Sequence, residues 1–327
     1  MKKALVCGAG GFIGGHMVKR LLAEGYKVLG VDLKSTSEWY QVHGPAMNQG
    51  FFDLRDANQV NQLFEAGNFD EVYQFAADMG GAGYIFTGEH DADVMHNSAS
   101  INLNIAHAIA TRSPKTKAFY SSSACIYPAH NQVDPENPNC EESSAYPAAP
   151  DSEYGWEKLF SERMWRSFAR NYGIDVRIAR FHNIFGPYGT WDGGKEKAPA
   201  AMCRKALQAV NTLEVWGPGN QTRSFLYIDE CIEAVRRLME SEVIDVINIG
   251  SDEMISINNL ATMALELAGK NNVVDLVNIE GPVGVMGRSS DNEFIEEKLG
   301  WRPSEPLVDG MRKTLLWIEQ EMKDASL

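Results

Sequence analysis

Hydrophobic residues along the first half of the chain alternate between short continuous runs and longer stretches with helical spacing. The short runs, which are typical of buried strands, cover residues 3–8, 27–31, 71–75, 118–121 and 176–180. The helical stretches cover residues 14–23, 98–111 and 156–171. Strands that alternate with helices favour a parallel sheet covered on both faces. The pattern therefore predicts an α/β fold with a doubly wound parallel sheet.

After about residue 185 the regular pattern gives way to turns rich in glycine and proline and to short helices. We interpret this part as a smaller C-terminal lobe that binds substrate. Apolar runs at 226–228 and 246–249 are candidates for strands that return to the main sheet. The expected division is a nucleotide-binding domain over 1–185, with returning segments at about 220–250, and a lobe over 186–327.

Charge and composition exclude several classes of protein. A net charge of −14 over 327 residues argues against nonspecific binding to nucleic acid. The chain contains no apolar run of about 20 residues that could span a membrane, and residues 1–8 resemble a strand rather than a signal peptide. The five cysteines are scattered and resemble neither a disulfide framework nor a metal site. We expect a reduced, cytoplasmic protein without a metal.

A glycine-rich turn lies between the first predicted strand and the first predicted helix. Gly8, Gly11 and Gly14 are spaced so that backbone N–H groups at the helix N-terminus can approach a pyrophosphate. Asp32 ends the next strand, where its carboxylate can bind a ribose diol and would repel a 2′-phosphate. Glycines also form ordinary turns and Asp32 could be a solvated turn residue, but the strand–helix context favours NAD.

A possible redox group consists of Ser123, Tyr154 and Lys158. The four-residue spacing places Tyr154 and Lys158 on one face of a helix, where the ammonium would lower the tyrosine pKa. The tyrosine could then take the proton of a substrate hydroxyl while a nicotinamide accepts the hydride, and Ser123 could hydrogen-bond the same oxygen. The alternative, a helix that only packs Tyr154 against the sheet, is disfavoured by the glycine-rich turn.

These segments, with residues 180–187 and 223–229, resemble the extended short-chain dehydrogenase/reductase family over almost the whole chain. The resemblance implies a Rossmann-type domain, a nucleotide-sugar-binding lobe and assembly as a homodimer. It also implies further contacts to the cofactor, which are assigned to Phe12, Ile13, Asp53, Leu54 and Ala76.

Residues 78–83, 123–128, 189–191, 196–201, 221–225 and 248–254 are similar to those members of the family that epimerise GDP-mannose at C3 and C5. The resemblance implies that Cys125 is a base and Lys197 an acid. Taken alone, Cys125 could be a small core residue, and Lys197 could belong to a solvated face with Lys195, Arg204 and Lys205. Alternatively, Lys205, Arg223 and Arg288 could neutralise a diphosphate. The substrate contacts implied are Gly83, Ser123, Ala124, Cys125, Asn183, Glu196, Lys197, Lys205, Gln221, Arg223 and Arg288.

Oxidation of C4 to a ketone would make the hydrogens on C3 and C5 acidic, so that a base and an acid could invert both carbons. The expected products are GDP-L-galactose, GDP-L-gulose or both. Another NAD-dependent nucleotide-sugar epimerase or dehydratase remains an alternative, although Ala124-Cys125 replaces the acidic pair usual in a 4,6-dehydratase. A noncatalytic NAD-binding protein is a remote third possibility.

Overall fold

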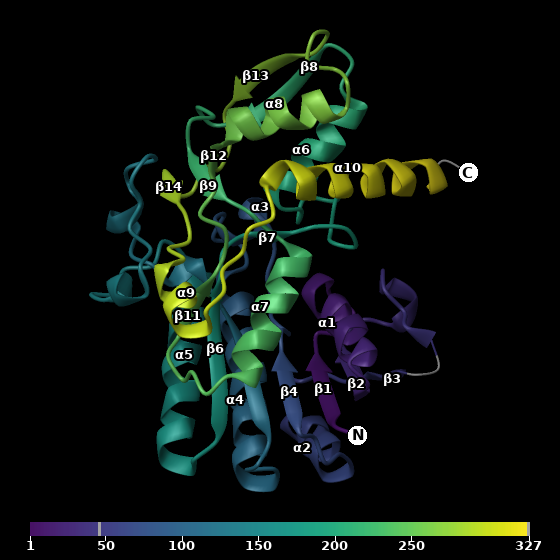
Figure 1. Cartoon of the computed structure of the whole chain (residues 1–327), viewed down its shortest axis with the longest axis vertical. Helices are drawn as coiled ribbons and strands as arrows, with labels where there is room; N and C mark the ends of the chain where they lie inside the picture. The colour runs from purple at the N-terminus through teal and green to yellow at the C-terminus, as the bar shows by residue number, and fades with distance from the viewer. Residues whose placement is uncertain (45–46, 326–327) are drawn as a thin grey trace.

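A computed structural model describes residues 1–44 and 47–325, and over these residues seven parallel strands form one central sheet (Figure 1). From edge to edge the strands are β11 (Ile247–Ile249), β6 (Asp175–Phe181), β5 (Lys117–Ser123), β4 (Glu71–Gln74), β1 (Lys3–Cys7), β2 (Lys27–Asp32) and β3 (Met47–Phe51). The strand order reverses between β1 and β4, and the carboxyl ends of strands at such a point border a ligand crevice. The predicted doubly wound sheet is confirmed.

Helices cover both faces of the sheet. One face carries α1 (Phe12–Ala23) and α7 (Ile228–Glu240), and the other carries α2 (Ala57–Ala66), α4 (Asp91–Arg112) and α5 (Glu153–Tyr172). The strands are apolar on both sides because each face packs against a helical layer. In the part of the chain that the structure describes, no helix has both the length and the apolar character needed to cross a membrane.

Two details differ from the predicted elements. The edge strand β3 was not predicted, because Met47–Phe51 contains polar residues and a glycine instead of an apolar run. The run at 246–249 does return to the main sheet as β11 beside β6. The run at 226–228 does not, because β10 (Leu226–Tyr227) pairs with β7 (Ile184–Phe185) and Ile228 begins α7.

A smaller group of elements lies beyond the carboxyl ends of the sheet strands, at the top of Figure 1. It contains α6 (Ala198–Gln208), β8 (Thr212–Trp216), β9 (Thr222–Ser224), β12 (Met254–Ser256), α8 (Ile257–Leu267), β13 (Asp275–Ile279), β14 (Gly287–Arg288) and α10 (Leu307–Asp324). Two further α-helices are short, α3 (Ala82–Ile85) and α9 (Glu293–Leu299). Strand β9 pairs with β14, which places Arg223 beside Arg288.

Candidate active site

The turn from β1 to α1 is shaped so that only glycine fits at its key positions. Gly8 has a φ of +81°, and a Cβ there would lie 2.9 Å from the backbone nitrogen of Ala76. A Cβ on Gly14 would lie 2.1 Å from the Gly8 carbonyl oxygen. Gly11 caps α1, which Phe12 and Ile13 begin. The glycines therefore allow a tight turn that leads directly into the N-terminus of α1, as binding of a dinucleotide pyrophosphate requires.

Asp32 lies against this turn at the end of β2. Its Oδ2 accepts a hydrogen bond from the Gly10 N–H at 3.0 Å, and its Oδ1 accepts one from the Lys34 N–H at 2.9 Å. A carboxylate held beside the glycine loop is suited to accept the hydroxyl groups of an adenosine ribose. Together the loop and Asp32 fit NAD.

Of the other predicted cofactor contacts, Ala76 lies at the glycine turn, whereas Asp53 and Leu54 have other partners in the structure. Ala76 packs directly against Gly8, as described above. The Asp53 carboxylate bonds to the Arg55 guanidinium at 2.7 and 2.8 Å, and this partner lowers the pKa of Asp53. The Leu54 side chain is buried in the core, while its carbonyl oxygen accepts a hydrogen bond from Asn104.

Ser123, Tyr154 and Lys158 come together where β5 ends and α5 begins. Ser152 caps α5, which contains both Tyr154 and Lys158. Their four-residue spacing places them one turn apart on the helix, and both are buried. The Lys158 ammonium donates to the Ser121 carbonyl oxygen at 2.9 Å and lies 5.7 Å from the centre of the Tyr154 ring. The arrangement can hold a substrate hydroxyl between serine and tyrosine.

The expected lowering of the Tyr154 pKa by Lys158 is wrong for this structure. Burial raises the pKa of Tyr154 above its ordinary value, the nearby Cys125 adds to the rise, and a hydrogen bond with Ser123 opposes it. Burial likewise lowers the pKa of Lys158. Desolvation dominates because both side chains are buried, and a buried charge loses its contact with water.

Cys125 lies in the short helix at Ala124–Ile126 that directly follows β5. Its side chain is half-buried, whereas the other four cysteines are buried, as is Ala124. The Arg288 Nη1 donates to the Cys125 sulfur at 3.1 Å. The thiolate is the form of a cysteine that acts as a base or nucleophile, and the Arg288 guanidinium is the cation in contact with this sulfur.

Lys197 caps the N-terminus of α6, so it approaches the site from the smaller group of elements, whereas Cys125 follows a sheet strand. Its ammonium donates to the Gly80 carbonyl oxygen at 3.3 Å. Burial lowers the pKa of Lys197; the nearby Cys125 opposes this effect and Arg288 adds to it. Arg288 is thus the cationic neighbour of Lys197, whereas the Lys195 ammonium lies 4.0 Å from the centre of the Tyr84 ring.

Two predicted substrate contacts, Lys205 and Gln221, lie near Trp216, and a third, Arg223, lies beside Arg288. Lys205 donates to the Glu214 carbonyl oxygen at 2.8 Å and lies 5.7 Å from the Trp216 ring. Gln221 donates to the Trp216 carbonyl oxygen at 3.0 Å. Arg223 is held by carbonyl oxygens of the 283–285 segment, and burial, with Arg288 nearby, lowers its pKa to about 10.

The remaining predicted contacts lie in two loops and in the short helix α3. Asn183 adopts a positive φ of 44° and donates to the Ser224 carbonyl oxygen at 3.0 Å. Glu196 pairs with Arg204 at 2.9 Å. A Cβ at Gly83 would lie 3.9 Å from the Trp216 ring, so this glycine borders the same region as Lys205 and Gln221.

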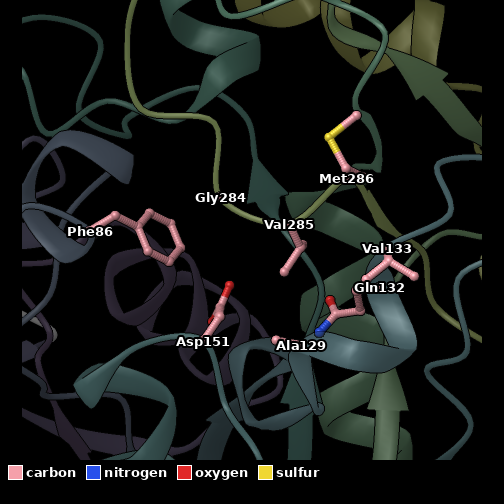
Figure 2. Close-up of a pocket in the computed structure, with 8 residues that line it drawn as sticks. All are labelled: Phe86, Ala129, Gln132, Val133, Asp151, Gly284, Val285 and Met286. Carbon is pink, nitrogen blue, oxygen red and sulfur yellow. The ribbon is translucent and has the colours of Figure 1, made fainter.

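A cavity of about 390 Å³ opens beside Arg288 and is shown in Figure 2. Its lining residues are Phe86, Ala129, Gln132, Val133, Asp151, Gly284, Val285 and Met286. Two of them, Gln132 and Asp151, were not predicted from the sequence. The Arg288 Nε donates to the Gln132 Oε1 at 2.5 Å, and the Arg288 Nη2 donates to the Asp151 Oδ2 at 3.3 Å. They are 156 and 137 positions from Arg288, and no motif announces either contact.

A glycine turn that fits NAD, with a buried serine, tyrosine and lysine at neighbouring strand and helix ends, defines an NAD-dependent enzyme of the short-chain dehydrogenase/reductase type. The pattern of the NAD dependent epimerase/dehydratase family matches residues 4–250, and the chain belongs to that family.

Among proteins similar to this chain are several nucleotide-sugar epimerases. The GDP-mannose 3,5-epimerase of Arabidopsis thaliana is 44% identical over 98% of this chain and 83% of that protein. The GDP-mannose 3,5-epimerase 1 of Oryza sativa subsp. indica is 43% identical over 97% of this chain and 82% of that protein. The UDP-glucose 4-epimerase of Thermotoga maritima shares the fold, with a TM-score of 0.86 at 23% identity, covering 98% of this chain and 99% of that one.

Proposed function

We propose that the protein epimerises GDP-mannose at C3 and C5 through a transient 4-keto intermediate and releases GDP-L-galactose, GDP-L-gulose or both. The observation that carries the proposal is the position of Cys125, whose sulfur accepts a hydrogen bond from Arg288 close to the Ser123, Tyr154 and Lys158 group. A 4-epimerase has no need of such a thiol. The similarity to two plant GDP-mannose 3,5-epimerases supports the same substrate.

The first step is oxidation of the C4 hydroxyl, for which bound NAD supplies the hydride acceptor. Tyr154 removes the hydroxyl proton, and Ser123 orients the same oxygen. Lys158 holds a positive charge beside the tyrosine, although burial lowers the pKa of Lys158 and raises that of Tyr154. The tyrosine returns the proton when the alcohol is restored at the end of the cycle.

The second step inverts C3 and C5 while C4 is a ketone. The Cys125 thiolate removes a ring proton, and the electron pair is delocalised onto the C4 oxygen as an enolate. Lys197 then delivers a proton from the other side of the ring, because the two groups approach from different parts of the fold. Burial lowers the Lys197 pKa, which makes its ammonium a better acid.

In this proposal the smaller lobe holds the nucleotide. Lys205, Gln221 and Arg223 lie on or beside the strands of that lobe and present cationic and amide groups. Gly83 of α3, with Asn183 and Glu196 from loops, then completes the sugar pocket.

The decisive experiment is incubation of the purified protein with GDP-mannose in D2O, followed by NMR and mass spectrometry. We expect deuterium at C3 and C5 and the appearance of L-galacto or L-gulo products. Turnover of a different nucleotide sugar, without exchange into GDP-mannose, would contradict the substrate assignment. Inversion at C4 alone would identify a 4-epimerase.

We also propose that two copies of the chain associate through α4 and α5. These helices pack against each other, and their outer surfaces expose Leu103, Trp156 and Phe160. Apolar side chains gathered on one helix pair favour self-association.

Light scattering should give the mass of a dimer, and Phe160→Glu should give a monomer. Val210→Glu, at an exposed apolar position on a different surface, is the control; a monomeric parent protein would refute the proposal.

A further inference from the structure

The Arg288 guanidinium is held in place by three different groups. Its Nη1 donates to the Cys125 sulfur at 3.1 Å, its Nε to the Gln132 Oε1 at 2.5 Å, and its Nη2 to the Asp151 Oδ2 at 3.3 Å. The side chain is only 6% exposed, so its orientation is determined by these partners and not by water. We propose that Asp151 and Gln132 are positioning residues that hold Arg288 against the Cys125 sulfur.

Gln132 is itself oriented by the backbone. Its side-chain nitrogen donates to the carbonyl oxygens of Tyr127 and Pro128, at 3.0 and 3.1 Å. Both protons of the amide are thereby used, which leaves Oε1 as the acceptor that faces Arg288. Because Gln132 is fully buried, this acceptor lies at a fixed position relative to the segment that carries Cys125.

Asp151 supplies the charged partner. It forms an ion pair with Arg288 at 3.3 Å, and its side chain is 11% exposed. In Figure 2 its carboxylate projects into the cavity beside Val285, on the opposite side from the Gln132 amide. The guanidinium is thus bracketed between an amide and a carboxylate, and its remaining nitrogen is directed at sulfur. A planar fork with several donors suits this role, which a lysine could not fill.

The consequence concerns the base of the proposed reaction, so this inference rests on the proposed function. The basic and nucleophilic form of a cysteine is the thiolate, and the Arg288 guanidinium places an opposite charge in contact with the Cys125 sulfur. If either partner of Arg288 is lost, the guanidinium is free to turn away from the sulfur. Ser123, Tyr154 and Lys158 make none of these three contacts to Arg288, so the variants leave the hydrogen bonds of the redox group in place.

The test is the rate at which iodoacetamide alkylates Cys125 at neutral pH, measured by peptide mass spectrometry on the NAD-loaded protein. The half-buried Cys125 can be followed separately because the other cysteines are buried. We expect Asp151→Ala to slow alkylation about tenfold through loss of the nearby cation. Asp151→Asn, which keeps an acceptor oxygen, should stay within about twofold of the parent protein.

Two further variants separate positioning from other effects. Arg288→Ala should slow alkylation at least as much as Asp151→Ala, and the double variant should be no slower than Arg288→Ala, because Asp151 acts only through the arginine. Asp134→Asn removes the same charge from an exposed position and should have no effect. If Asp151→Ala does not bind NAD, Gln132→Met replaces it, with the same expected slowdown.

Unchanged or faster alkylation in Asp151→Ala would overturn the inference, because Asp151 would then only neutralise the arginine. Additive slowing in the double variant would overturn it as well. The alkylation assay requires no sugar, so its outcome is independent of whether GDP-mannose is the substrate. Conversely, absence of deuterium exchange into GDP-mannose would refute the proposed function and leave the alkylation result in place.

Discussion

The buried imidazole of His182 should make the stability of the protein depend on pH. Its Nε2 lies 3.0 Å from the Asn248 Oδ1, and the Asn248 side-chain nitrogen donates to the Cys140 carbonyl oxygen at 2.8 Å. The imidazole therefore carries its proton on Nε2. Among the described residues the buried Nδ1 has no hydrogen-bond partner, so a second proton there would be an unpaired buried charge. Burial accordingly lowers the pKa of His182 to about 3.

The sign and size of the effect follow from proton binding. Below the ordinary histidine pKa of 6.5 the unfolded chain takes up a proton at this position, whereas the folded protein does not until about pH 3. Stability is therefore lost as the pH falls from about 6.5, and the loss levels off near pH 3. Each pH unit within this window costs about 1.4 kcal/mol, which gives about 2 kcal/mol between pH 7 and pH 5.

Urea unfolding of the parent protein and of His182→Gln at pH 7 and pH 5 measures this contribution. Glutamine can donate to Asn248 but does not titrate. We expect the free energy of unfolding of the variant to fall by about 2 kcal/mol less than that of the parent protein. His130→Gln, at an exposed position, should follow the parent protein. Equal losses in the parent protein and His182→Gln would refute the reasoning.

Three further predictions concern the site. Gly14→Ala should weaken NAD binding in calorimetry and lower the free energy of unfolding by about 1–3 kcal/mol, because the new Cβ meets the Gly8 carbonyl oxygen; unchanged NAD affinity would contradict it. Tyr154→Phe should reduce transient formation of the reduced cofactor on mixing with GDP-mannose by about 100-fold or more, and normal formation would exclude the tyrosine as the base. Lys197→Ala should lower the rate of epimerisation about 100-fold while the reduced cofactor still forms. Loss of both signals would instead assign the lysine to substrate binding.

Much of the sheet and of the cofactor loop can be predicted from local patterns. Strands that are buried on both faces are continuous apolar runs, so the central strands are visible in the sequence, whereas the polar edge strand β3 is not. Asp32 could be assigned because a β–α–β connection brings the end of β2 beside the turn that follows β1. The resemblance to a family added Cys125 and Lys197.

The surroundings of the reacting groups were decided by packing. Arg288 reaches Cys125 across 163 positions, and it is held by residues 137 and 156 positions away, separations at which no periodicity or motif links the partners. The sequence spacing of Tyr154 and Lys158 suggested a lowered tyrosine pKa, but burial raises it. Spacing along a helix determines which side chains are neighbours, while desolvation and long-range contacts depend on how distant segments pack. The chemistry of Cys125 therefore belongs to the tertiary structure, although the residue itself can be found in the sequence.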